Sequence, residues 1–98
     1  MSAADLFEVG DDDTVEEAWF VAASLLDMLE QTQKLGELYD FAQARERMAQ
    51  LRAMAEAHRI DGTTRCKCGL SDAEHALLKR KILTFFKLQV ANLKHFLA

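Results

Sequence analysis

The sequence predicts an all-α fold, a three-helix bundle, on the strength of its composition and its helix start signals. The 98 residues include no proline, and half of them are hydrophobic. Alanine, leucine, glutamate and other residues that favour helices dominate, so no segment requires a strand. We predict a single helical domain over residues 14–98, with helices at about 15–33, 37–59 and 72–97, preceded by an acidic lead-in over residues 1–13.

The first helix is expected to begin after a capping box, Thr14-Val15-Glu16-Glu17. The Thr14 hydroxyl can accept a hydrogen bond from the backbone N–H of Glu17, whose carboxylate can reach back to Thr14. Apolar residues then recur at three- and four-residue spacing, which is typical of a helix that buries one face. The predicted buried positions, with the tryptophan as an anchor, are Val15, Trp19, Ala22, Leu25 or Leu26, and Leu29.

The second helix follows Gly36, where the phase of the apolar pattern changes and a turn or a sharp kink is expected. Its predicted buried stripe comprises Leu38, Phe41, Ala44, Met48, Leu51 and Ala55. Charges at heptad spacing lie on other faces: Arg45, Arg52 and Arg59 on this helix, and Glu16 and Glu30 on the first. In an antiparallel hairpin these charges would flank the seam as weak ion pairs; the alternative is two solvated faces.

The third helix is expected to start at Asp72, after a second capping box formed by Ser71 and Glu74. Its apolar residues surround most of the circumference, more than two partner helices can cover. We therefore predict that this helix forms a homodimer or docks onto another protein. The predicted contact residues are Leu83, Phe86, Val90, Leu93 and Leu97, together with Leu6 and Phe7 in the acidic lead-in.

The segment between the second and third helices carries a candidate metal site. Cys66 and Cys68, the only cysteines, are followed by Gly69 and then His75 in the first turn of the third helix, and His58 lies just upstream. Two thiols and two imidazoles are the ligand set of a closed tetrahedral zinc site. The run C-x-C-G-x5-H resembles a short motif of various small zinc-binding proteins. The alternatives are two reduced cysteines in an ordinary loop, or a thiol redox sensor.

The charges are unevenly distributed along the chain. The formal net charge is −4, yet residues 1–30 hold nine acidic and no basic residues, whereas residues 61–98 hold three acidic and seven basic ones. The basic end allows an alternative function, nucleic-acid binding next to a zinc-braced loop, although the acidic net charge argues against it. The residues that would carry it are Arg65, Lys67, Arg80, Lys81 and Lys87.

Several other functions are not expected. A phosphate-binding glycine loop, a nucleophile elbow and a facing pair of catalytic carboxylates are all missing from the sequence, so we expect neither an enzyme nor a small-molecule substrate. A secretion signal and a membrane span are missing as well, which predicts a cytoplasmic protein without a membrane partner. The sequence therefore predicts a small intracellular adaptor or inhibitor that binds another protein.

Overall fold

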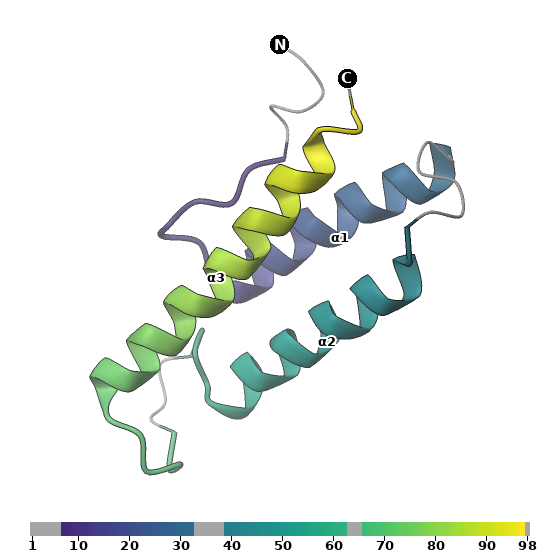
Figure 1. Ribbon diagram of the computed structural model, residues 1–98. Coiled ribbons are helices and arrows are strands. Elements are labelled where there is room, and N and C mark those ends of the chain that lie inside the picture. The colour runs from purple at the N-terminus through teal and green to yellow at the C-terminus, as the bar shows by residue number, and fades with distance from the viewer. Residues whose placement is uncertain (1–6, 33–38, 63–65, 98) are drawn as a thin grey trace.

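The computed structural model describes residues 7–32, 39–62 and 66–97 and contains three α-helices (Figure 1). They are α1 (Val15–Thr32), α2 (Phe41–Ala57) and α3 (Asp72–Lys94). The described ranges contain no strand. The predicted all-α, three-helix class is therefore confirmed. None of these helices is long and apolar enough to cross a membrane.

The helix α1 is the central element, because it packs against both of the others while α2 and α3 make little direct contact. In Figure 1, α1 lies behind, and α2 and α3 diverge in front of it from the end where the loop joins them. The molecule is a slab of 44 × 29 × 16 Å with a radius of gyration of 14.7 Å. A compact chain of this length would have a radius of about 13 Å. The bundle is thus flat, because α2 and α3 cover α1 only partly.

A single apolar core holds the helices together. It is built on α1, whose small and branched residues allow the other two helices to approach closely. Phe86 at its centre is fully buried against the leucines of α1. The buried residues are Val15, Ala18, Ala22, Leu25, Leu26, Leu29, Met48, Ala55, Ile82, Leu83, Phe86, Val90 and Leu93.

The predicted docking face of the third helix is mostly buried in the core, which corrects the prediction that it is free to bind a partner. Leu83, Phe86, Val90 and Leu93 are at most 5% exposed, because α1 covers them, so they are not available to a partner. Leu97 and Phe7 are partly buried and pack against the same core, while Leu6 lies outside the described residues. The third helix does carry apolar residues on several sides, but its most continuous face is used internally.

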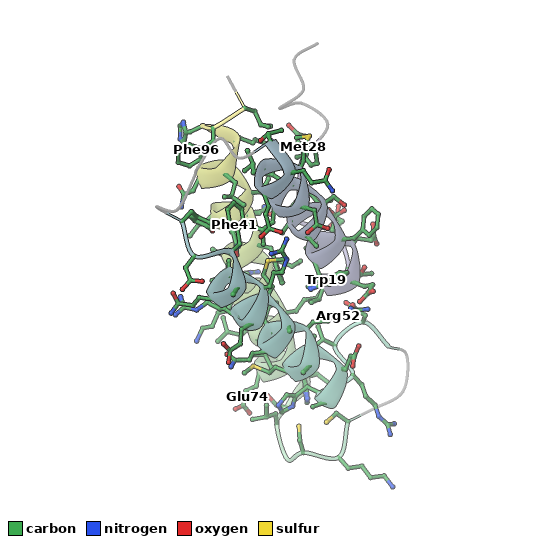
Figure 2. The ribbon with its side chains drawn as sticks, turned by 90° about the vertical axis from the view of Figure 1, so that its right-hand side faces the viewer. Trp19, Met28, Phe41, Arg52, Glu74 and Phe96 are labelled. Atoms are coloured by element: carbon green, nitrogen blue, oxygen red, sulfur yellow. The ribbon has the colours of Figure 1, made fainter. Side chains whose placement is uncertain are left out.

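The start of α1 agrees with the prediction. Thr14 Oγ1 accepts a hydrogen bond from Glu17 N at 3.0 Å, and Glu17 Oε1 accepts one from Thr14 N at 3.3 Å. Trp19 is only partly buried, and the Arg52 guanidinium stacks over its ring at 4.1 Å (Figure 2). This contact makes Trp19 part of the α1–α2 seam as well as of the core.

The helix α2 is shorter than predicted at both ends. It begins at Phe41 because Asp40 caps it, with Oδ1 accepting a hydrogen bond from Gln43 N at 2.9 Å. The predicted turn at Gly36 lies outside the described residues. At the other end, Arg59 has a φ of 51°, so the helix stops at Ala57.

The helix α3 starts at Asp72 as predicted, and the capping box of Ser71 and Glu74 is complete. Glu74 N donates to Ser71 Oγ, and Ser71 N donates to Glu74 Oε1, both at 3.1 Å. The helix ends at Lys94, three residues earlier than predicted, and turn hydrogen bonds from Phe96 and Leu97 close the end.

The predicted ion pairs between the first two helices are confirmed for two of the three arginines. Arg45 binds Glu30 and Asp27, each at 2.7 Å, and Arg52 binds Glu16 at 2.5 Å. Arg45, near the start of α2, is paired with the end of α1, and Arg52, in the second half of α2, is paired with the start of α1. This is the arrangement that an antiparallel hairpin requires. All are solvent-exposed, so each contributes at most about 1 kcal/mol.

Candidate metal centre

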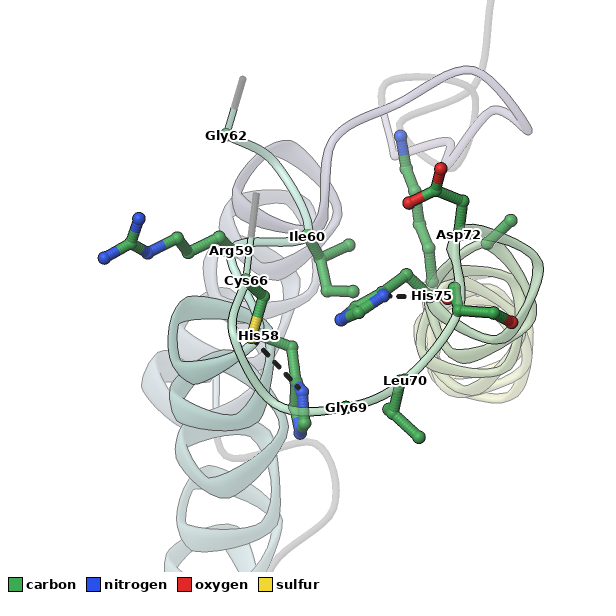
Figure 3. A pocket seen from close by; sticks show the side chains of 12 residues that line it. His58, Arg59, Ile60, Gly62, Cys66, Gly69, Leu70, Asp72 and His75 are labelled. Atoms are coloured by element: carbon green, nitrogen blue, oxygen red, sulfur yellow. Dashed lines mark hydrogen bonds between the residues drawn. The ribbon is translucent and has the colours of Figure 1, made fainter. Parts of the chain in front are cut away.

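The chain brings the four predicted ligands together at the end where α2 and α3 meet. His58 is the C-cap residue of α2, and His75 lies in the first turn of α3. Cys66 and Cys68 come from the loop between these helices. Figure 3 shows this loop passing around the His58 and His75 rings, with Cys66 hydrogen-bonded to His58. The four ligand atoms all lie within 4.8 Å of one another.

The distances between donor atoms are those of a small coordination shell. Cys68 Sγ lies 3.3 Å from His58 Nδ1 and 3.2 Å from His75 Nε2. Cys66 Sγ lies 4.0 Å from His58 Nδ1. In a tetrahedral zinc site with ordinary bond lengths, the ligand atoms are separated by about 3.3–3.8 Å. The cluster can therefore hold a metal ion with only small adjustments.

The His75 ring is oriented by the backbone ahead of it. The capping box of α3 fixes the first turn, and His75 Nδ1 lies 2.9 Å from the Ser71 carbonyl oxygen. When Nδ1 carries the proton and donates to this oxygen, Nε2 is left unprotonated and free to bind a metal. Metal-bound histidines commonly use the second ring nitrogen in this way.

The loop bends at Gly69, directly after the second cysteine. Its φ of +86° belongs to a region that residues with a Cβ rarely adopt. This bend lets the short C-x-C segment present both sulfur atoms on the same side as the two rings.

Asp61 anchors the same loop to α1, a contact that the sequence did not predict. Its two carboxylate oxygens accept hydrogen bonds from Val15 N at 2.9 Å and Glu16 N at 3.0 Å. These are free N–H groups in the first turn of α1, where the helix dipole also favours a negative charge. No local spacing connects residues that are 45 and 46 positions apart. The one local signal at this position is the pair Asp61-Gly62, which is typical of a turn and does not predict a contact with α1.

The environment of the cysteines favours one thiolate over the other. The backbone N–H of Leu70 and the neighbouring Cys66 side chain lower the pKa of Cys68 to about 6. The hydrogen bond to Cys68 in turn raises the pKa of the Cys66 thiol. The Ser71 carbonyl raises the pKa of His75. Of the two thiols, Cys68 is thus the one whose surroundings favour the thiolate, the form that binds a cation.

The donor set leaves little room for catalysis at a bound ion. Both sulfurs and both imidazoles point into one cluster, and four protein ligands fill a tetrahedral shell. Glu74 neighbours His75 in sequence, but its carboxylate is held by the Ser71 backbone N–H. This hydrogen bond lowers the pKa of Glu74.

In the described part of the chain, acidic side chains lie among the residues predicted for nucleic-acid binding. Lys87 is ion-paired with Asp11, and Asp11 and Asp12 line the same hollow as Arg80. Lys67 and Lys81 are exposed, and Arg65 lies outside the described residues. Asp11 and Asp12 of the acidic lead-in thus lie against the basic helix and offset part of its charge.

Comparisons with known proteins give no relative. No family model matches this chain, and no curated protein or solved structure matches it. The function of the site has to be inferred from its own chemistry.

Proposed function

We propose that His58, Cys66, Cys68 and His75 bind one structural zinc ion that staples α2 to α3. The observation that carries this proposal is the convergence of two sulfur and two nitrogen donors within 4.8 Å of one another. A mixed thiolate and imidazole set of this size suits zinc, whereas calcium and magnesium require oxygen ligands. The ion would close a loop in a flat domain that has a small core, where an added link contributes most.

Zinc binding is tested by metal analysis and by substitution of one ligand at a time. The purified chain should bind one equivalent of zinc, and cobalt in its place should give the visible spectrum of a tetrahedral site with two thiolates. Cys68→Ser and His75→Ala should each abolish tight binding. Removing zinc with a chelator should lower the melting temperature of the native chain, because metal binding energy is folding energy in such sites.

His95→Ala is the matched control, since His95 is an exposed histidine at the other end of α3. It should bind zinc as the native chain does. A chain that contains no zinc after purification in its presence, or whose melting temperature is the same with and without chelator, contradicts the proposal.

We propose further that the domain acts by binding a protein rather than by catalysis. The support is the number of large apolar side chains left on the surface of so small a domain. Phe20 is 65% exposed and Leu88 is 60% exposed, and four others are at least 38% exposed: Met54, Leu70, Leu77 and Phe96. Such side chains in contiguous groups mark association surfaces.

A further inference from the structure

An apolar groove runs between the first half of α2 and the last half of α3, at the end opposite the metal centre. Its volume is about 480 Å³. The groove exists because α2 and α3 diverge and both rest on α1 (Figure 1). Phe85 and the exposed Leu88 line it from α3, and the exposed Phe96 lines it from the turn after that helix. We call this surface the α2–α3 groove.

We propose that the α2–α3 groove binds a second copy of this chain, giving a symmetric dimer. This inference deepens the association function proposed above, since it names the partner, and it does not depend on zinc. In a two-fold symmetric contact the same surface meets itself, so its features must complement themselves. Both walls of the groove satisfy this condition.

On α3, the residues that face the groove have a symmetric order. Leu88 and Asn92 are four residues apart on one face of α3, and Phe96, in the turn directly after this helix, lines the same groove. Two such helices packed antiparallel about a two-fold axis at Asn92 place Leu88 of each copy against Phe96 of the other. The two Asn92 carboxamides then meet at the axis, where a polar pair fixes the register of packed helices.

On α2, the charges at the groove are also self-complementary. Asp40 and Arg47 line the groove seven residues apart, with Gln43 and Ala44 between them. An axis at the level of Gln43 brings Arg47 of one copy opposite Asp40 of the other. Arg47 forms no ion pair with another residue of the described chain, unlike Arg45 and Arg52.

The distribution of acidic residues also favours this face for self-association. The net charge of −4 opposes the approach of two copies. None of the exposed acids of α1 lines the groove, and three of them, Glu16, Asp27 and Glu30, are already ion-paired with arginines of α2. A groove-to-groove contact therefore does not bring the acids of α1 together. The slab measures 44 × 29 Å in its broad plane, enough for the roughly 800 Å² that each partner of a stable dimer buries.

Analytical ultracentrifugation of the zinc-loaded full chain, from low to high micromolar concentration, tests the proposal. The native chain should sediment as a dimer that dissociates on dilution. Leu88→Asp should raise the dissociation constant of the dimer at least about tenfold, because it removes a buried leucine from each copy. Arg47→Asp should also raise it, because like charges then face each other across the axis.

Two matched variants control for general effects of the substitutions. Leu77→Asp changes a leucine of similar exposure on the same helix but outside the groove, and Arg80→Asp reverses a charge on another face. Neither should change the dissociation constant by more than about twofold. All four positions are at the surface, and circular dichroism should show the same helix content in each variant.

A chain that remains monomeric at all concentrations overturns the proposal, and so does a dimer that Leu88→Asp and Leu77→Asp affect equally. The second result would leave the association function standing and place the contact elsewhere. Zinc content is measured on the same samples, so loss of the dimer without loss of zinc separates a failure of the groove from a failure of the metal centre.

Discussion

At the scale of single residues, Arg59 carries the one positive φ among the described non-glycine residues, at 51°. It follows the C-cap of α2, where Arg59 N donates to Glu56 O at 3.1 Å and Ile60 N donates to Ala55 O at 2.9 Å. These two bonds form a Schellman motif, in which glycine is the usual residue at this position. Ile60 then packs onto the core, so the chain reversal at Arg59 also sets the direction in which the loop that carries Cys66 and Cys68 leaves α2.

Arg59→Gly is expected to raise the free energy of unfolding by about 0.5–1 kcal/mol, because relief of the left-handed strain exceeds the added freedom of the unfolded chain. Urea denaturation of the zinc-loaded protein measures this. Gln50→Gly, at an exposed position in the middle of α2 and outside the groove, should instead lower the free energy of unfolding by about 1 kcal/mol. Equal losses for both variants would show that the arginine side chain at position 59 has a stabilising role of its own.

At the scale of elements, the three helices depend on capping groups that are close in sequence, with one exception. Thr14, Asp40 and Ser71 each cap the helix that follows them. Asp61 instead caps α1 from the far side of α2. The start of α1, the end of α2 and the metal-binding loop are therefore joined by one carboxylate.

Asp61→Ala should lower the free energy of unfolding by about 1 kcal/mol, the usual cost of losing an N-cap. It leaves Val15 N and Glu16 N without these hydrogen bonds, so hydrogen exchange at both amides should become faster. Asp12→Ala, an exposed aspartate of the lead-in, is the control and should change neither quantity. Unchanged exchange at these amides in Asp61→Ala would refute the tertiary cap.

At the scale of the whole molecule, the titratable groups of the candidate metal centre couple stability to pH. In the metal-free chain, Cys68 has a lowered pKa of about 6, so its thiolate stabilises the folded chain above the ordinary thiol pKa. This contribution to stability is lost as the pH falls through about 6. His75 has a raised pKa, so its contribution is present at low pH and is lost as the pH rises through that pKa. The two effects oppose each other. A bound metal needs both groups deprotonated, so with metal present both act in the same direction.

We therefore expect the gain in melting temperature that zinc provides to shrink between about pH 8 and about pH 5, because protons compete with the metal for thiolate and imidazole. The metal-free chain should change less over this range. Melting curves with and without chelator at each pH give the difference directly. A zinc-dependent gain that is constant across the range would mean that the ligands are not the titrating thiols and imidazoles.

The sequence by itself determined the helix starts and the ligand set, because both depend on residues a few positions apart. Thr14 with Glu17, and Ser71 with Glu74, start α1 and α3 where predicted. The histidines and cysteines converge because one short loop carries them between two helix ends. The ends of α2 were harder to predict: the Asp40 cap was overlooked, and an arginine occupies the position where glycine would have marked the C-terminal stop.

Tertiary structure alone decided which side of α3 is covered. The helix is apolar on several faces, so its sequence pattern could not distinguish the buried residues, such as Phe86, from the exposed ones, such as Leu88. The packing of α1 made that choice, since a helix interface covers only one stripe of a cylinder. The Asp61 cap on α1 was equally beyond local patterns, because it joins segments that approach each other only when the chain has folded.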